Sequence, residues 1–333
     1  MTERCSYAAR YINRGQVSAS ATAFAPANIA LCKYWGKRNR TLNLPLTSSL
    51  SVSLGTHGTT TTIEFSEHDT LTLNEKQIGL ESTNASARAF AERLWEYIDL
   101  FREPGECLAV RTSNTIPTAA GLASSASGFA ACTKALNDLF GWQADDAALS
   151  RLARLGSGSA CRSLWHGFAR WNAGVREDGD DCYAEPFGSD WPDLRLAVCP
   201  VDTSQKPVSS RDAMNATVAN SPLFRGWEAC VTRDLCAIET SIINQDFERL
   251  GKTAERNALA MHATMLGCET PILYWLPATV DAIHQAARLR ADGIPIYVTI
   301  DAGPNPKLLY QQQHEAVIAA QWPDAMLITP WSA

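Results

Sequence analysis

The sequence lacks any uninterrupted apolar stretch of the length that a membrane-spanning helix requires, about 20 residues. Its apolar runs are short and are broken by Gly, Ser or Pro. Residues 1–20 carry arginines but no apolar segment of the kind found in secretory signal peptides. We therefore expect no membrane partner, a leader over residues 1–20 that precedes the folded part, and a cytoplasmic location.

An excess of basic residues is also missing, since 29 Lys and Arg stand against 35 Asp and Glu, a net charge of −6. Proteins that bind nucleic acid usually carry a basic face, so we expect no nucleic-acid partner. Small anionic substrates stay compatible with this charge because a few local cations suffice to bind them.

Metal-binding motifs are absent too. The ten cysteines include no Cys-x-x-Cys pair, and the six histidines form no His-Glu-x-x-His motif. These absences argue against a zinc site or a redox dithiol, and buried thiols that act as small apolar groups are the simpler interpretation. We predict no metal held by protein ligands alone, although a Mg²⁺ held by nucleotide phosphates would leave little trace in a sequence.

What the sequence does contain is enough apolar material for two cores, because 46% of its 333 residues are hydrophobic. Strand and helix patterns mix without a strict β-α-β rhythm, which favours the α+β class. Alternation rich in threonine predicts separate strands at 50–54 and 59–65, and residues 306–321 are predicted to be a helix. A shift toward Ser, Lys and Arg at 202–211 indicates a domain boundary near residue 203.

A loop of small residues, Pro117–Ser125, lies between a predicted strand and a predicted helix. Its backbone N–H groups and the start of the helix suit an anion, and the hydroxyls of Ser124 and Ser125 can bond phosphate. It is not a Walker A motif, since no Gly-Lys-Ser/Thr follows. A tightly packed strand–helix turn explains the small residues equally well, so the loop alone leaves both interpretations open.

Three further segments carry groups suited to chemistry. Asn28–Arg38 holds three cations and two aromatic residues within six positions, which suits phosphate but also fits a solvated basic turn. Gly156–Ser163 ends on Arg162, a possible clamp for a carboxylate or phosphate, or else is a flexible surface loop. Asp301 ends an apolar strand before a Gly-Pro turn, where it can orient or deprotonate a hydroxyl or simply cap the turn.

Taken together and in order, these segments resemble the GHMP kinase superfamily and, within it, the diphosphomevalonate decarboxylases. The resemblance covers roughly residues 20–330, and it is carried by Ala25–Ala30, Lys33–Arg38, Leu42–Pro45, Ser48–Ser51, Pro117–Ala126, Gly156–Ser163, Met261–Thr264 and Asp301–Asn305. It implies the GHMP kinase fold, a two-domain α/β sandwich with a deep cleft between an N-terminal domain over 21–203 and a C-terminal domain over 204–333.

The resemblance also implies an activity. Members use ATP and Mg²⁺ to phosphorylate the 3-hydroxyl of (R)-5-diphosphomevalonate and then decarboxylate it to isopentenyl diphosphate, and a homodimer is implied as well. Three alternatives stay open: a decarboxylase of 5-phosphomevalonate, a mevalonate 3-kinase, and a non-catalytic relative that senses a ligand. Because Arg162 and Asp301 are both present, decarboxylation is favoured over simple kinase action.

Roles for individual residues follow from the same resemblance. Asp301 orients or deprotonates the 3-hydroxyl, Arg162 holds the substrate carboxylate, and Lys33 lies near the phosphoryl path. Contacts with the substrate phosphates are implied for Tyr34, Lys37, Ser157, Ser159 and Arg211. Contacts with ATP are implied for Asn114, Ala119, Ala120, Gly121, Leu122, Ala123, Ser124 and Ser125.

One departure concerns an arginine that many members carry early in the helix after the first sheet, where it binds the diphosphate. Residues 82–87 contain no arginine, and Arg88 is the nearest candidate. The sequence therefore leaves open how many phosphates the substrate carries.

Overall fold

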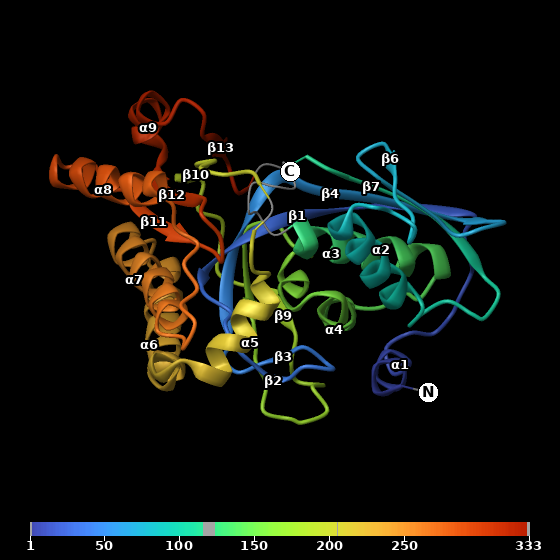
Figure 1. The fold of residues 1–333 in the computed structure, drawn as a ribbon. Helices are drawn as coiled ribbons and strands as arrows, with labels where there is room; N and C mark the ends of the chain where they lie inside the picture. The colour runs from blue at the N-terminus through green and yellow to red at the C-terminus, as the bar shows by residue number, and fades with distance from the viewer. Residues whose placement is uncertain (1, 116–123, 205, 332–333) are drawn as a thin grey trace.

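A computed structural model of the chain describes residues 2–115, 124–204 and 206–331. Two sheets, each packed against helices, form the two halves of the molecule, and a two-stranded hairpin lies beside the first (Figure 1). The predicted α+β class is confirmed.

The first half contains, in chain order, α1 (Glu3–Ala8), β1 (Ser20–Cys32), β2 (Lys37–Asn39), β3 (Leu44–Pro45), β4 (Ser49–Ser66), β5 (Thr70–Leu73), β6 (Lys76–Gln77), α2 (Ala85–Ile98), β7 (Cys107–Asn114), α3 (Ser124–Phe140), α4 (Asp146–Gly156), the 3-10 helix η1 (Gly158–Arg162), β8 (Phe168–Trp171) and β9 (Ala184–Pro186). The second half contains β10 (Leu194–Val198), α5 (Ser210–Asn220), the 3-10 helix η2 (Pro222–Gly226), α6 (Trp227–Ile243), α7 (Phe247–Leu266), α8 (Pro277–Ala291), β11 (Tyr297–Ile300), β12 (Pro306–Gln311), the 3-10 helix η3 (Gln312–His314), α9 (Glu315–Gln321) and β13 (Met326–Ile328).

The first sheet is organised around β4, which crosses it as one strand instead of the two predicted. One edge of β4 pairs with β1, and its other edge pairs with β8 and then β7. Glycines at the predicted turn accompany a shift in register opposite Pro26, and a side chain at Gly58 would collide with the backbone of Ala25. The glycines therefore allow close approach at a bulge, and the chain does not turn there.

Helices α2, α3 and α4 lie together on one side of this sheet (Figure 1). Their apolar side chains, such as Leu94, Phe129 and Leu152, form one core with Ile63 and Val110 of the strands. The segment before residue 21 also joins this core, because Tyr7 and Ala8 of α1 are buried against it. The expected leader is therefore part of the packed structure.

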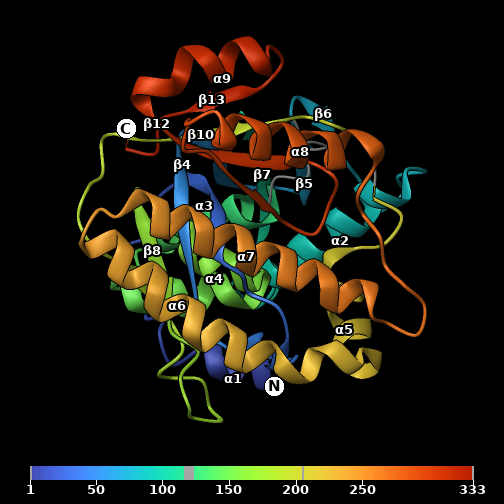
Figure 2. The same ribbon diagram turned by 90° about the vertical axis from the view of Figure 1, so that its left-hand side faces the viewer.

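The second sheet, in the order β11-β12-β10-β13, lies between two helical layers, with α6 and α7 side by side across one face (Figure 2). Alternate residues of β10 face opposite layers, as the pleat of a strand dictates. Leu194 and Leu196 join the core that contains α6 and α7, whereas Ala197 packs with residues of α8 and α9. The predicted boundary at residue 203 falls in the connection between β10 and α5.

The prediction of a helix at 306–321 is wrong over its first part. Residues Pro306–Gln311 form β12, which pairs with β10 on one side and β11 on the other. A strand covered on both faces carries a continuous apolar run, here Leu308, Leu309 and Tyr310, and such a run does not reveal its periodicity. The helical part is confined to η3 and α9.

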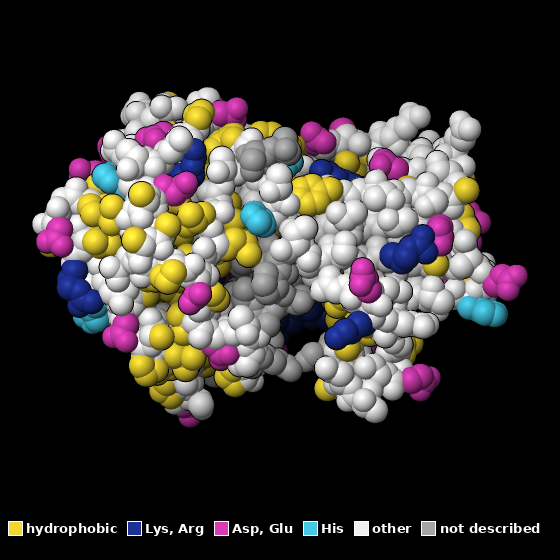
Figure 3. Space-filling view, turned by 90° about the horizontal axis from the view of Figure 1, so that it is seen from above, with side chains coloured by type: hydrophobic (Ala, Val, Ile, Leu, Met, Phe, Trp, Pro, Cys, Tyr) yellow, Lys and Arg dark blue, Asp and Glu magenta, His cyan; other side chains and the backbone are white. Residues whose placement is uncertain are grey.

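The two halves share a core at the C-terminal end of β1. Ile29 and Leu31 pack in the same cluster as Val231 and Ile238 of α6 and residues of α7. This packing places the residues that follow β1 at the junction of the halves, where Figure 3 shows a hollow with Lys and Arg surface at its floor.

Candidate active site

The centre of the candidate site is a carboxylate held between two ammonium groups. Lys33 follows β1, and its Nζ donates a hydrogen bond to Oδ1 of Asp301 at 2.7 Å. On the other side, Nζ of Lys307 on β12 lies 3.2 Å from Oδ2 of Asp301. Both lysine side chains are 2% exposed and that of Asp301 is 26% exposed, so the carboxylate is partly accessible while the two lysines are buried.

The charges of this cluster set its protonation. Burial alone raises the pKa of Asp301, but Lys33 and Lys307 together outweigh burial and hold that pKa below its ordinary range. Burial lowers the pKa of Lys33, and the charges of Lys307 and Arg162 add to this effect while Asp301 opposes it. Asp301 is therefore ionised at neutral pH and available as a hydrogen-bond acceptor.

Helix α7 positions the backbone on both sides of the cluster. Oδ1 of Asn257 accepts a hydrogen bond from the backbone N–H of Lys33 at 2.8 Å, and its Nδ2 donates to the buried Asp234 at 3.1 Å. One turn and a half further along, Nε2 of His262 donates to the carbonyl of Asp301 at 3.1 Å. Burial, and then the charge of Lys33, lower the pKa of His262 to about 4, so the ring is neutral and serves as a structural donor.

Arg162, at the end of η1, is the buried cation that faces this cluster. Its Nη1 donates to Oγ of Ser49 at 2.5 Å, and its guanidinium carbon lies 5.7 Å from the ring centre of Trp171. Within the described part of the chain, its buried Nε has no hydrogen-bond partner. A buried guanidinium with a free N–H is suited to hold an anionic ligand in a fixed direction.

Tyr34 and the serine loop form the wall next to Arg162. The ring of Tyr34 packs edge-on against Trp171 with centroids 4.7 Å apart, and its buried hydroxyl has no partner among the described residues. A side chain at Gly158 would come within 2.9 Å of that hydroxyl, so glycine is needed for the close approach. Ser157 and Ser159 flank Gly158. Nδ2 of Asn28 donates a hydrogen bond to Oγ of Ser163 at 2.7 Å, which holds the end of the loop against β1.

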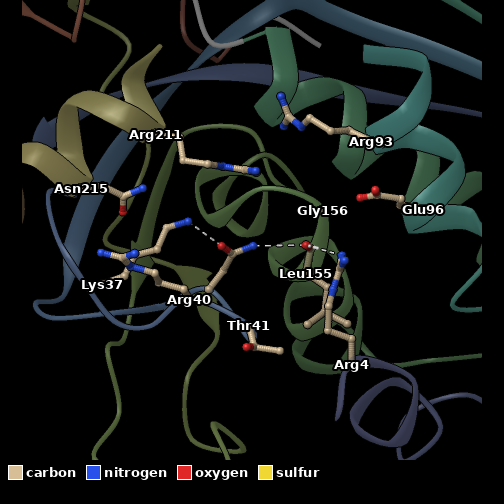
Figure 4. A pocket seen from close by; sticks show the side chains of 11 residues that line it. Arg4, Lys37, Arg40, Thr41, Arg93, Glu96, Leu155, Gly156, Arg211 and Asn215 are labelled. Carbon is tan, nitrogen blue, oxygen red and sulfur yellow. Dashed lines mark hydrogen bonds between the residues drawn. The ribbon is translucent and has the colours of Figure 1, made fainter. Parts of the chain in front are cut away.

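Beside this wall lies a cavity of about 250 Å³ into which Lys37 and Arg211 project from β2 and α5 (Figure 4). The other residues that line the cavity are Arg4, Arg40, Thr41, Asn43, Arg93, Glu96, Leu155, Gly156 and Asn215. Nζ of Lys37 donates to Oδ1 of Asn43 at 2.6 Å. Burial, and then the charges of Arg211, Arg93 and Arg40, lower the pKa of Lys37 to about 8.

The residues predicted to contact nucleotide are placed only in part. Asn114 ends β7, where its Oδ1 accepts a hydrogen bond from Thr59 at 2.6 Å, and Thr59 also bonds Ser127 of α3. Ser124 is the first residue of α3, and Ser125 lines a small apolar cavity with Phe90 and Phe129. Ala119, Ala120, Gly121, Leu122 and Ala123 lie outside the described residues.

Four cations at the site, Lys307, Arg93, Arg4 and Arg40, were not singled out from the sequence. Lys307 belongs to the segment predicted as helix, so its contact with Asp301 depends on a strand pairing that the local pattern does not reveal. Arg93 lines the cavity, whereas Arg88, the candidate suggested by position, is solvent-exposed and pairs with Glu92. Arg4 comes from α1, in the segment expected to precede the fold.

The described residues contain no group of three or more His, Cys, Asp or Glu side chains placed to hold a metal ion. In the same residues, none of the helices combines the length and apolarity needed to cross a membrane. The arrangement can therefore hold two anionic parts of one ligand, at Arg162 and in the cationic cavity, with the partly exposed Asp301 carboxylate as a hydrogen-bond acceptor.

Both halves of the chain match models of known protein families. A family model described as the diphosphomevalonate decarboxylase-like N-terminal domain matches residues 25–184, and one described as the mevalonate 5-diphosphate decarboxylase C-terminal domain matches residues 196–326. The diphosphomevalonate decarboxylase of Aspergillus fumigatus is 40% identical over 319 residues, which cover 90% of this chain and 78% of the relative. That of Saccharomyces cerevisiae is 37% identical, with 90% and 80% covered.

Solved structures are similar over nearly the whole chain. The crystal structure of mevalonate diphosphate decarboxylase from Staphylococcus aureus has a TM-score of 0.86 at 33% identity, covering 95% of this chain and 96% of its own. The Enterococcus faecalis enzyme has a TM-score of 0.83 at 37% identity, with 94% and 98% covered. A structure of MDDEF in complex with MVAPP, AMPPCP and magnesium has a TM-score of 0.84 at 38% identity, with the same coverage.

Proposed function

The chain belongs to the diphosphomevalonate decarboxylase family, and we propose from this premise how its own residues carry out the family's reaction. The protein is an ATP-dependent carboxy-lyase that converts (R)-5-diphosphomevalonate to isopentenyl diphosphate, with release of ADP, phosphate and CO₂. The γ-phosphoryl group of ATP passes to the 3-hydroxyl. The C1–C2 bond then breaks, its electron pair forms the C2=C3 double bond, and phosphate leaves C3 with the electrons of the C–O bond.

One observation supports the roles best: the Asp301 carboxylate lies between two buried ammonium groups and is itself partly exposed. We infer that Asp301 accepts a hydrogen bond from the 3-hydroxyl and so aims its oxygen at the phosphoryl group. A carboxylate whose pKa is held below its ordinary range is a weak base. Orientation is therefore its main contribution, which suits a phosphoryl transfer with a loose transition state and late loss of the proton.

Lys33 and Lys307 have a second task in this scheme. Phosphoryl transfer spreads negative charge over the oxygens of the transferred phosphoryl group. Catalysis therefore depends on cations that are already positioned near those oxygens. Both ammonium groups are fixed by Asp301, and Lys33 is fixed further through its backbone bond to Asn257. They are thus held where charge develops when the phosphoryl group reaches the 3-hydroxyl beside Asp301.

Arg162 is assigned to the substrate carboxylate. Its free Nε and its bond to Ser49 leave one edge of the guanidinium open to a carboxylate in a fixed direction. The C1–C2 bond can break only when its electrons align with the departing phosphate at C3, so holding the carboxylate in place promotes the second step. Burial keeps water away from this ion pair and makes it stronger than it would be in solvent.

The phosphates of the substrate are assigned to the wall formed by Tyr34 and the serine loop and to the cationic cavity beside it. The donors are the hydroxyl of Tyr34, which has no partner among the described residues, the hydroxyls of Ser157 and Ser159, and the cations Lys37 and Arg211. Gly156, which precedes the two serines, lines the same cavity as Lys37 and Arg211. Hydroxyl and cationic donors are the groups that phosphate oxygens accept from most readily. These five residues anchor the substrate at the end remote from the reacting carbon.

The protein uses ATP and Mg²⁺. Asn114, Ser124 and Ser125, at the end of β7 and the start of α3, are proposed to contact the nucleotide together with residues 119–123. Because the described acidic and histidine side chains form no cluster of three, we assign the ion mainly to nucleotide oxygens. When bound, Mg²⁺ neutralises phosphate charge and favours departure of ADP.

A cytoplasmic location and a homodimer complete the proposal. All ten cysteines are free thiols, as expected in a reducing compartment. Exposed large apolar side chains of the second half include Leu223, Leu266, Leu273 and Leu276. Figure 3 shows apolar surface gathered on this half. Size-exclusion chromatography with light scattering tests the dimer, and a mass of one chain at micromolar concentration would contradict it.

Steady-state kinetics with mevalonate, its 5-phosphate and its 5-diphosphate test the function. We expect the 5-diphosphate to have the highest kcat/KM, with CO₂ released for every ADP formed. A higher kcat/KM for the 5-phosphate would contradict the substrate, and a 3-phosphorylated product formed without CO₂ would contradict the reaction.

A further inference from the structure

The cavity between β2, α1, α2 and α5 holds an unusual concentration of positive charge for a chain of net charge −6. Five of its lining side chains are cationic, namely Arg4, Lys37, Arg40, Arg93 and Arg211. The single carboxylate among the lining residues belongs to Glu96. These cations come from α1, from β2 and the turn after it, from α2 and from α5. Figure 4 shows them around one space, so distant parts of the chain converge there.

These five cations have no carboxylate partners. Among the ion pairs of the described residues, none involves any of them or Glu96. Arginines close to them in the chain do form such pairs: Arg10 with Asp180, and Arg88 with Glu92. A cluster of unpaired and partly buried cations costs free energy, so a bound anion is the simplest reason for its presence.

Arg4 is held in the wall of the cavity but keeps unused donors. Its Nη2 donates to the carbonyl of Leu155 at 2.9 Å, while its buried Nε has no partner among the described residues. The helix that carries it is fixed independently, because the hydroxyl of Tyr7 donates to the carbonyl of Gly179 at 3.0 Å. Arg4 is therefore anchored at one end and free to bond a ligand.

Arg93 approaches from α2, opposite Arg211. Its guanidinium carbon lies 5.6 Å from the ring centre of Phe129, and that ring packs directly against Gly156 at the start of the serine loop. Burial and the charge of Arg211 both lower the pKa of Arg93, and the same two influences act on Arg4. The charge of Glu96 raises the pKa of both arginines without outweighing burial, so Arg211 repels Arg4 and Arg93 across a space that an anion would fill.

The cavity also has the right place and size for one end of the substrate. Lys37 and Arg211, which we assign to the substrate phosphates, line it together with Arg4 and Arg93. Its volume of about 250 Å³ lies below the roughly 300–1,000 Å³ of a pocket for a whole ligand of drug size. A phosphate group and its bound water fit a space of this kind better than the entire substrate does.

We propose that Arg4 and Arg93 bind the terminal phosphate of the substrate's diphosphate, and that α1 is thereby part of the substrate site. The proposal rests on the proposed function and extends it. Arg93, one turn and more beyond Arg88, takes the place of the arginine that the sequence lacks at 82–87. With both guanidinium groups assigned to that phosphate, the pair selects for a substrate that carries it.

Single and double variants, Arg4→Gln and Arg93→Gln, test this directly against matched controls. Arg10→Gln removes a charge at the end of the same helix as Arg4, and Arg88→Gln removes one from the same helix as Arg93. We expect each test variant to raise KM for 5-diphosphomevalonate about 10- to 100-fold with kcat nearly unchanged, as for a lost charge-assisted hydrogen bond. The kcat/KM for the 5-phosphate should change less than threefold, and the controls should match the wild type.

Binding of inorganic pyrophosphate, measured by calorimetry, separates this proposal from the proposed function. We expect the double variant to bind pyrophosphate at least tenfold more weakly than the wild type, whether or not the protein turns over any substrate. Equal affinities would overturn the roles of Arg4 and Arg93 and leave the decarboxylase function standing. An inactive wild type that still shows the tenfold difference would overturn the function and leave the anion site standing.

A conservative variant guards against a merely structural effect. Arg4→Lys keeps the charge and can still donate to Leu155, so we expect it to recover part of the lost affinity. If Arg4→Lys and Arg10→Gln were both as impaired as Arg4→Gln, α1 would act through packing alone and the proposal would be wrong.

Discussion

Replacement of Lys307 by methionine removes one of the two charges that flank Asp301 and keeps a side chain of similar length. Its ammonium lies 3.2 Å from Oδ2 of Asp301, and at an effective dielectric constant of 20 Coulomb's law gives an attraction of about 5 kcal/mol. Asp301 is 26% exposed, so solvent screens part of this attraction and the figure is an upper limit. We expect kcat to fall about 10²- to 10³-fold, the usual effect of removing one preorganised charge from a transition state.

The same change should alter the dependence of kcat on pH. In the wild type the pKa of Asp301 is held below its ordinary range, so the carboxylate stays ionised as the pH falls. Without Lys307, only Lys33 opposes the effect of burial, so the pKa of Asp301 should be higher than in the wild type. Asp301 should then become protonated, and kcat begin to fall, at a higher pH than in the wild type. KM for both substrates should change little, because the loss concerns the chemical step.

Stopped-flow measurement of ADP release over a range of pH provides the test. Lys252→Met is the matched control, because Lys252 is an exposed lysine of α7 that pairs with Glu248 away from the site. A Lys307→Met enzyme with kcat within threefold of the wild type and an unchanged pH profile would refute this reasoning about Asp301.

The remaining predictions concern three other residues. Arg162→Gln should slow CO₂ release at least 100-fold in a membrane-inlet mass spectrometer, since the substrate carboxylate is no longer held, and a normal rate would remove that role. Lys37 has a pKa lowered to about 8 and binds phosphate as an ammonium, so pyrophosphate affinity should decline above pH 8. Arginine stays charged there, so a Lys37→Arg variant that declined equally steeply would contradict the assignment. The pKa of His262 falls from 6.5 to about 4 on folding, so the unfolded chain binds more protons between these values and the stability is lost as pH falls through that window. The loss amounts to roughly 3 kcal/mol in chemical denaturation, and a His262→Gln variant with the same loss would show that another group is responsible.

How far the sequence predicts the site depends on how local each signal is. Lys33, Arg162 and Asp301 each occupy a short segment with a recognisable residue pattern, and the structure brings all three to the junction of the halves. Lys307 carries no such pattern. It meets Asp301 because β12 pairs with β11, and a strand buried on both faces cannot be told from a helix by periodicity over six residues.

The cationic cavity shows the same limit more clearly. Lys37 and Arg211 could be named from their motifs. Arg4 lies in the segment expected to be a leader, and Arg93 lies in the helix after the first sheet, outside residues 82–87. Position along the chain suggested Arg88, but its side chain is exposed to solvent. Which side of α2 faces the cavity depends on how α2 packs against α3, and that packing cannot be read from the local sequence. Convergence of four elements on one space is a property of tertiary packing and leaves no local trace in the sequence.

The central claim is that one active site joins phosphorylation of the 3-hydroxyl to loss of the carboxylate. Its most direct test is a single-turnover reaction with ATP and 5-diphosphomevalonate labelled with ¹³C at C1, followed by mass spectrometry of the products. The account predicts one labelled CO₂ and one isopentenyl diphosphate for every ADP. Formation of ADP with the label retained in a stable 3-phosphorylated product would contradict it.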